Sequence, residues 1–124
     1  MGIKFNNQEI SDAEKYYRTI HISERQKTLI EPVVKAISGQ IHISELAIKG
    51  FLWRAITEWQ MENQKELADV ENLSADQRVH IFKIILDLIK KSFTRILIDK
   101  SQEPLLEKAL DNVSLFYKTQ YLRK

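Results

Sequence analysis

Polar and apolar side chains alternate between Tyr17 and Ile22. In an extended chain, Tyr17, Thr19 and His21 lie on one face, and Ile20 and Ile22 lie on the other. Hydroxyl and imidazole groups both donate and accept hydrogen bonds, as the edges of DNA bases in the major groove require. The pattern therefore predicts a short strand with one apolar face and one face that can form hydrogen bonds.

A single strand leaves its backbone donors and acceptors unpaired, so it needs a partner strand. No second segment of similar quality occurs in the sequence. The partner is therefore expected to be the same strand of another copy of the chain. A two-stranded ribbon of this kind is one of the ways in which proteins contact the major groove.

Residues for other chemistries lack the necessary spacing. The three histidines, His21, His42 and His80, do not have metal-ligand spacing, and there is no cysteine. The three glycines are too far apart for a phosphate-binding loop, and no serine, threonine or carboxylate pair lies in a catalytic motif. The sequence therefore predicts no metal site, no cofactor and no enzymatic activity.

Helical periodicity and helix-capping signals account for most of the remaining chain. Ser23 with Gln26, and Ser74 with Gln77, match the capping-box pattern, and Gly39 suits a helix C-terminus. The predicted helices cover about residues 23–39, with Pro32 bending or restarting the first of them, and about 44–63, 74–99 and 101–122. A rival capping box, Ser11-Asp12-Ala13-Glu14, predicts a short helix over 12–17 that competes with the strand.

Two groups of side chains in these helices are explained by solvent exposure or by packing. Lys83, Lys90, Lys91 and Arg95 are expected on a solvated face of the long helix. Trp59 is expected in the core, and Trp53 either at an oligomer interface or in ordinary packing.

The composition limits the fold class and the cellular setting. Hydrophobic residues make up 44% of the 124 residues, and only three Gly and two Pro are present, so a mainly α fold is expected. The net charge of +2 is only weakly basic. The N-terminus lacks a signal-peptide pattern, and the apolar run 84–86 is far too short to span a membrane. We expect a cytoplasmic protein without a membrane partner.

The order of strand, capped helix, glycine turn and second helix resembles the ribbon-helix-helix superfamily of DNA-binding proteins, the Arc, MetJ and CopG group. The segment from Gly39 to Leu46, which ends in Ser44-Glu45-Leu46, looks like the turn between that family's two helices. The segment Ile20-His21-Ile22-Ser23-Glu24 looks like its strand running into the first helix. The resemblance covers residues 17–62.

The resemblance implies roles for particular residues. The strands of two copies would pair, with Tyr17, Thr19 and His21 facing the bases, while Arg18 points inward or flanks the ribbon. A shift of one residue in register would exchange Arg18 with these three. The backbone amides of His42, Ile43 and Ser44, at the start of the second helix, would hold a DNA phosphate.

The resemblance also implies a domain organisation and a function. A flexible arm over 1–16 would precede a DNA-binding unit over 17–63, and 74–124 would form an added antiparallel helical hairpin for oligomerisation or partner docking. The protein would be a homodimer or homotetramer that binds specific double-stranded DNA. It would act as a plasmid- or phage-type transcriptional regulator, a partition factor or an accessory protein of the conjugative relaxosome.

An alternative stays open. The chain could be an all-helical protein-interaction module, such as an inhibitor, an immunity protein or a phage accessory protein, that does not bind DNA. In that case residues 11–22 are helical and no ribbon exists.

Overall fold

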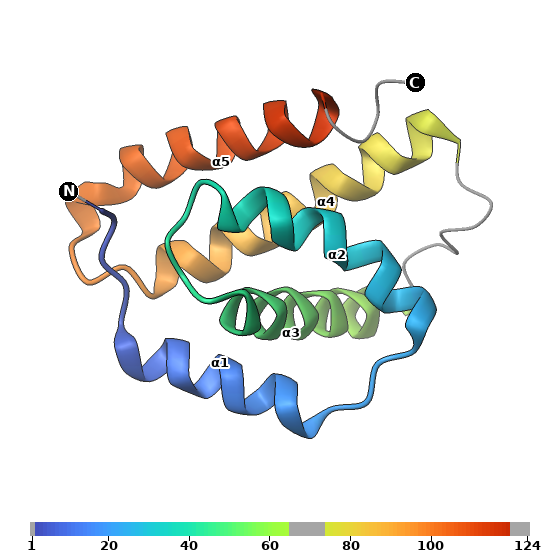
Figure 1. Cartoon of the computed structure of the whole chain (residues 1–124), viewed down its shortest axis with the longest axis horizontal. Helices are drawn as coiled ribbons and strands as arrows, with labels where there is room; N and C mark the ends of the chain where they lie inside the picture. Colours follow the sequence, from blue (N-terminus) through green and yellow to red (C-terminus); the bar gives the residue numbers. More distant parts are fainter. Residues whose placement is uncertain (1, 65–73, 120–124) are drawn as a thin grey trace.

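The computed structural model describes residues 2–64 and 74–119, which form a mainly helical fold (Figure 1). Within these two ranges lie five α-helices, one short 3-10 helix and no strand. The mainly α class predicted from the composition is confirmed. The elements are α1 (Asn7–Thr19), α2 (Glu24–Ser38), α3 (Glu45–Asn63), α4 (Ala75–Arg95), the 3-10 helix η2 (Lys100–Gln102) and α5 (Glu103–Tyr117).

The strand predicted at 17–22 is wrong, because residues 17–19 form the last turn of α1 and 20–23 are an irregular connection. The helix begins well before the alternating segment. The side chain of its N-cap residue, Asn6, accepts hydrogen bonds from the amides of Gln8 (2.9 Å) and Glu9 (3.2 Å). Ala13 is fully buried on the side of α1 that faces α3. The stabilisation from burying this face of α1 outweighs the strand preference of six alternating residues.

Residues 2–16, for which the sequence predicts a flexible arm, are instead attached to the rest of the fold. The segment before α1 pairs with residues 96–98: the Asn6 amide donates to the Ile96 carbonyl (2.9 Å), and the Ile98 amide donates to the Lys4 carbonyl (3.2 Å). Phe5 is only 6% exposed, and its ring centroid lies 5.4 Å from that of Phe93. Apolar burial and backbone pairing therefore hold this segment in place. Met1 lies outside the described residues.

α2 begins and ends where the sequence predicts, but it runs continuously through Pro32. The Ser23 hydroxyl accepts a hydrogen bond from the Gln26 amide (3.3 Å), and the helix ends at Ser38, before Gly39. Fully buried side chains lie on both sides of the proline: Ile30, Val33, Val34 and Ile37. Because both halves of the helix are packed into the core, the missing amide of Pro32 does not divide it.

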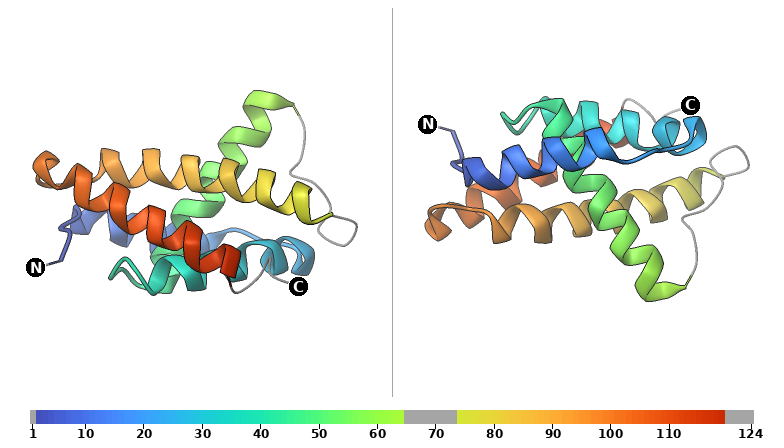
Figure 2. Two further views of the ribbon diagram at one scale, coloured as in Figure 1. Left: turned by 90° about the horizontal axis from the view of Figure 1, so that it is seen from above. Right: turned by 90° about the horizontal axis from the view of Figure 1, so that it is seen from below.

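α3 is the central helix and packs against α1, α2 and α4. Seven of its residues are buried: Ala47, Ile48, Gly50, Phe51, Leu52, Ala55 and Ile56. Figure 2 shows that α3 crosses the other helices steeply and that its C-terminal end extends beyond α4. The centre of α3 is therefore enclosed, while its last turns reach the surface.

α4 and α5 run antiparallel and share one hydrophobic core with the first three helices. The capping box predicted at the start of α4 is confirmed, with hydrogen bonds from the Gln77 amide to the Ser74 hydroxyl (3.2 Å) and from the Ser74 amide to the Gln77 side chain (2.8 Å). The rings of Phe51 and Phe93 meet edge to face at 5.5 Å. No helix in the described ranges is long and apolar enough to cross a membrane.

Candidate functional site

The residues predicted to face DNA bases lie at the end of α1 and in the connection after it. Arg18 and Thr19 are exposed, and the Thr19 hydroxyl donates to the Tyr16 carbonyl (2.9 Å). Tyr17 is half-buried, and its ring centroid lies 6.0 Å from Nζ of Lys49 on α3. His21 is exposed in the connection. These side chains do not share the face of a strand, so the alternation that suggested base contact is absent.

The predicted phosphate-binding residues lie at the start of α3. His42 is exposed, Ile43 packs partly against the core, and Ser44 is the N-cap of α3. The Ser44 hydroxyl accepts from the Ala47 amide (3.2 Å) and donates to a carboxylate oxygen of Glu14 (2.9 Å). A negative side chain thus already lies at the positive end of the helix, where it would repel a phosphate.

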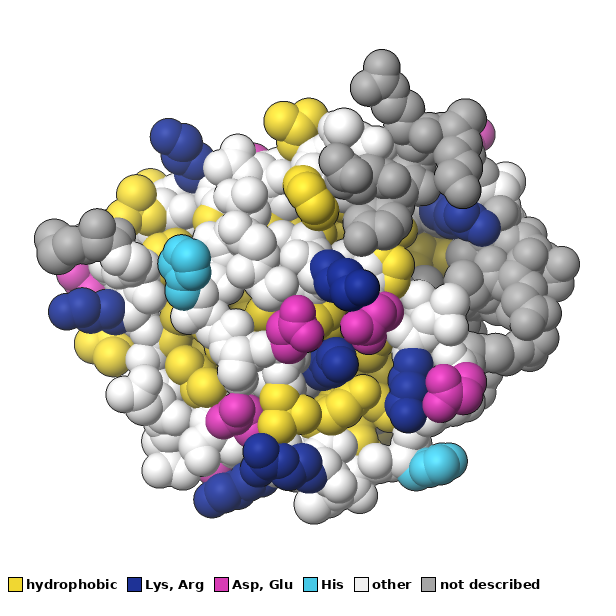
Figure 3. All heavy atoms as spheres, in the orientation of Figure 1, with side chains coloured by type: hydrophobic (Ala, Val, Ile, Leu, Met, Phe, Trp, Pro, Cys, Tyr) yellow, Lys and Arg dark blue, Asp and Glu magenta, His cyan; other side chains and the backbone are white. Residues whose placement is uncertain are grey.

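Acidic and basic side chains are intermingled on the face of the molecule where α2 crosses it (Figure 3). Two ion pairs explain part of this pattern: Lys27 with Glu24 at 3.3 Å and Lys49 with Glu31 at 3.7 Å. This face therefore lacks the continuous basic stripe that is typical of DNA-binding surfaces.

A cleft of about 270 Å³ lies between α3 and α4. Apolar and charged side chains both line it. The lining residues are Phe51, Arg54, Ala55, Glu58, Trp59 and Glu62 from α3, and Leu88, Lys91, Ser92 and Arg95 from α4. On both helices they recur at intervals of three and four residues, so each helix contributes one continuous face.

The charged groups of the cleft are not neutralised by one another. No ion pair within the described ranges involves Arg54, Glu58, Glu62, Lys91 or Arg95. The Arg54 guanidinium instead lies over the ring of Tyr16, with its central carbon 4.7 Å from the ring centroid. Ionic groups that lie near each other without pairing are available to a ligand or partner.

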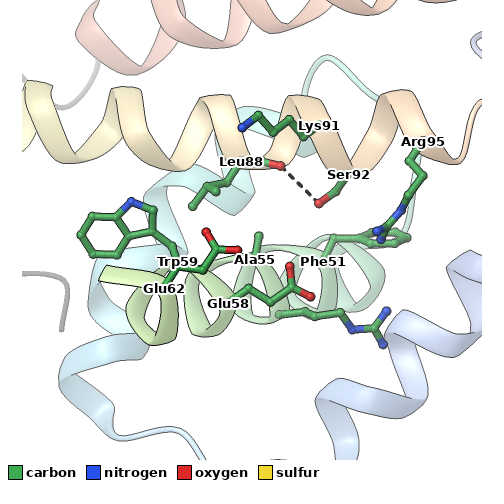
Figure 4. A pocket seen from close by; sticks show the side chains of 10 residues that line it. Phe51, Ala55, Glu58, Trp59, Glu62, Leu88, Lys91, Ser92 and Arg95 are labelled. Carbon is green, nitrogen blue, oxygen red and sulfur yellow. Dashed lines mark hydrogen bonds between the residues drawn. The ribbon is translucent and has the colours of Figure 1, made fainter. Parts of the chain in front are cut away.

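Figure 4 shows that the two ends of the cleft differ. Trp59 and Glu62 lie at one end, and Arg95 lies at the other end. Between them, the Ser92 hydroxyl donates to the Leu88 carbonyl of its own helix (3.2 Å). One end is therefore acidic and aromatic, and the other is basic.

The sequence alone did not indicate this cleft. Lys91 and Arg95 are exposed, as predicted for a solvated face, and Trp59 packs against the core as a half-buried residue, but all three also line the cleft. The available signal was the spacing of Leu88, Lys91 and Arg95 along one helix face. Nothing in the sequence indicated which part of α3 would lie opposite.

Other chemical sites are not evident in the part of the chain that the structure describes. No group of three or more His, Asp or Glu side chains there could hold a metal ion. The Lys90 pKa is raised because its ammonium group forms a 3.0 Å ion pair with Glu107, away from the cleft.

Comparison with protein-family models, with curated proteins and with solved structures found no match for this chain.

Proposed function

We propose that this chain is an all-helical protein-interaction module that binds a partner protein through the α3–α4 cleft. One observation carries the proposal: a half-buried tryptophan at the rim of a cleft whose charged side chains form no ion pairs within the described ranges. Tryptophan and arginine are the residue types that most often dominate the free energy of protein–protein binding.

The cleft also suggests the chemistry of the partner. An apolar side chain of the partner would pack against the apolar lining residues of the cleft, of which Leu88 is half-buried. A neighbouring carboxylate would reach the basic end, where Arg95 can form a charge-assisted hydrogen bond with it. The partner segment is therefore one that carries an apolar residue next to an acidic residue.

The exposed end of α3 supports the same proposal. Met61 is 74% exposed on the part of the helix that extends beyond α4 (Figure 2). Methionine is enriched at interfaces because its flexible side chain adapts to different partners. A partner seated in the cleft could therefore extend its contact along this end of α3.

Sequence-specific DNA binding, with the regulatory, partition and relaxosome roles attached to it, stays a prediction. The geometry supports it less well, because residues 17–19 are helical and Glu14 lies at the start of α3. The oligomeric state implied by the ribbon likewise stays a prediction.

Affinity capture with variant baits would test the proposed function. The wild-type chain and the variants Trp59→Ala and Arg95→Glu would be exposed to extracts of the source cell. Any protein captured by the wild type would be purified, and its binding would be measured by titration calorimetry. We expect each variant to weaken binding at least about tenfold, as is typical of residues at the centre of an interface.

The matched control is Lys83→Glu, which reverses an exposed charge on α4 outside the cleft. It should bind the partner as the wild type does. Equal binding by the wild type and both cleft variants, or the absence of any captured protein, would contradict the proposal.

A further inference from the structure

The contact between Tyr16 and Arg54 joins α1 to the α3–α4 cleft. Arg54 lines the cleft from α3, whereas Tyr16 belongs to α1, which contributes no residue to the lining. The central carbon of the Arg54 guanidinium lies 4.7 Å from the centroid of the Tyr16 ring, which is within the range of a cation–π interaction. Both side chains are half-buried. The position of a cationic group of the cleft therefore depends on a helix outside the cleft.

The packing of α1 on α3 brings this pair together. One turn earlier on each helix, the backbone of Ala13 lies directly against Gly50, where a Cβ atom would have no space. The two backbones can approach this closely because position 50 is glycine. The Tyr16 ring therefore lies over Arg54 as a consequence of the helix packing, and it does not depend on a bound ligand.

A neighbouring pair between the same two helices shows what distinguishes this contact. Nζ of Lys49 lies 6.0 Å from the ring centroid of Tyr17, but Lys49 also forms an ion pair with Glu31 at 3.7 Å and does not line the cleft. Arg54 forms no ion pair within the described ranges, so its charge is oriented by a neutral ring and is not cancelled by a carboxylate. A cation that is held in this way stays able to bind an anion.

We propose that Tyr16 is a positioning residue of the cleft, whose ring holds the Arg54 guanidinium in place to bind a carboxylate of the partner protein. The inference rests on the proposed function, which assigns an acidic residue to the partner. Arg54 and Arg95 line the cleft from α3 and α4, so a carboxylate there would be held from both helices. A guanidinium that is ordered before binding loses less conformational entropy when the partner binds, and its order therefore raises the affinity.

The orientation of Arg54 can be measured by NMR in the full chain without any ligand. Protons over the face of an aromatic ring resonate upfield, so the Nε–H signal of Arg54 should be shifted upfield in the wild type. Tyr16→Phe keeps the ring, and the Tyr16 hydroxyl forms no hydrogen bond within the described ranges, so this variant should keep the shift. Tyr16→Leu removes the ring and should return the signal to the position of an exposed arginine. An Arg54 signal without the upfield shift in the wild type would overturn the proposal, even if Tyr16→Leu did not fold.

Titration with an acidic dipeptide, followed in the same spectra, would test what this orientation does. The probe is N-acetyl-leucyl-aspartyl amide, which carries an apolar side chain next to a carboxylate, and its asparaginyl counterpart is the neutral control. Arg54→Gln should weaken binding of the aspartyl probe at least about tenfold, as for the loss of a hydrogen bond to a charged group. Tyr16→Leu should weaken it about two- to tenfold, as for the loss of one ordered side chain, and Tyr16→Phe should bind as the wild type does. In a chain that carries Arg54→Gln, Tyr16→Leu should have no further effect, because it acts through Arg54.

Tyr17→Leu is the matched control, because it removes the ring of the neighbouring pair between the same helices. It should leave binding of the dipeptide unchanged, and circular dichroism should show the same helix content in both leucine variants. Equal losses of affinity in Tyr16→Leu and Tyr17→Leu would mean that the rings only hold α1 against α3, and would overturn the proposal. A wild-type chain that does not distinguish the aspartyl probe from the asparaginyl probe would overturn it as well.

The failure of this inference can be distinguished from the failure of the proposed function. If Trp59→Ala loses a captured partner while dipeptide binding is independent of Tyr16, the proposed function stands and this inference is wrong. If the chain captures no protein but binds the dipeptide in a manner that depends on Tyr16 and Arg54, the carboxylate site stands and the proposed function is contradicted.

Discussion

Gly50 lies where the backbone of α1 passes over α3. A Cβ atom at this position would lie 2.1 Å from the Ala13 carbonyl oxygen, and backbone atoms cannot yield as a flexible side chain can. We expect Gly50→Ala to push the two helices apart and to lower the free energy of unfolding by about 1–3 kcal/mol, the usual cost of overpacking. Urea unfolding followed by circular dichroism would measure this change.

Gly39 provides the matched control for this prediction. A Cβ atom there would meet only the carbonyl oxygens of Lys35 and Ala36, both at 3.7 Å, and φ is −73°. Gly39→Ala should therefore be neutral or stabilise the fold by up to about 1 kcal/mol, because it restricts the unfolded chain. Equal losses in the two variants would contradict the close approach of α1 and α3.

The carboxyl group of Asp99 has a lowered pKa that can be measured directly. Its carboxylate accepts hydrogen bonds from the Ser101 hydroxyl (2.7 Å) and the Ser101 amide (2.9 Å), which lower the Asp99 pKa from its ordinary value of 3.8. We expect Ser101→Ala to raise this pKa toward that value, because the hydroxyl is the larger cause. Carbon-detected NMR titration of the carboxyl group would report it.

The lowered Asp99 pKa also determines how this residue changes the stability of the fold with pH. A carboxyl whose pKa is lower in the folded state stabilises the fold above its unfolded pKa, and this contribution is lost as the pH falls through the folded pKa. Ser38→Ala, which removes a hydroxyl bonded only to the Lys35 carbonyl, is the control. An Asp99 pKa that is the same in both variants and the wild type would refute the hydrogen-bond explanation.

At the scale of the elements, the starts of α2, α3 and α4 were predictable because their signals are local. Ser23, Ser44 and Ser74 each accept a hydrogen bond from an amide three residues later, and the sequence contains both members of each pair. The end of α2 before Gly39 is local in the same sense. These three helix starts and the end of α2 were therefore predicted correctly from a few neighbouring residues.

The conformation of residues 17–22 does not depend on neighbouring residues alone, and the strand prediction failed there. Six residues of alternation favour a strand when they are considered alone. The helix is selected by contacts with distant parts of the chain, above all by the fit of Ala13 on Gly50. The attachment of residues 2–6 to 96–98 is equally non-local. No periodicity within either segment could show it.

Phe5 allows that attachment to be tested. We expect Phe5→Ala to lower the free energy of unfolding by about 3–5 kcal/mol, as for other buried phenylalanines, because the ring packs on Phe93 in the core. The paired backbone should also open more readily. Hydrogen exchange should therefore become faster at the amides of Asn6 and Ile98.

Lys4→Ala is the control for this prediction. Its side chain is exposed, and the interactions of its backbone with Ile98 and Gln102 do not depend on that side chain. Stability and exchange rates should stay near those of the wild type. Fast exchange at Ile98 in the wild type itself would indicate that the segment is not held against the fold.

At the scale of the whole molecule, the α3–α4 cleft shows why function was harder to predict than fold. The charged residues of the cleft come from two helices whose relative placement depends on the core contact between Phe51 and Phe93. The sequence gives the spacing along each helix, but it does not give the crossing point. Arg54 and Arg95 could therefore not be assigned to one site in advance.

The overall charge distribution leads to a prediction about nucleic acid. The net charge is only +2, and part of the basic surface is paired with carboxylates, as in Lys27 with Glu24 and Lys90 with Glu107. Binding to DNA of any sequence relies on basic groups that are free to replace counterions. We expect gel-shift experiments with DNA from upstream of its own operon to show no sequence-specific complex, and only weak retention that disappears with added salt.

The Thr19→Ala/His21→Ala double variant makes this prediction decisive. The Thr19 hydroxyl is bonded to the Tyr16 carbonyl at the end of α1, and His21 lies in an irregular connection, so their loss should leave any weak retention unchanged. Backbone chemical shifts of residues 17–19 should be helical with and without DNA. The opposite result would be a salt-sensitive, sequence-specific complex that the double variant abolishes, with extended shifts at 17–22 in its presence. Such a result would mean that α1 refolds into a ribbon on DNA, and it would favour DNA binding over the protein-interaction proposal.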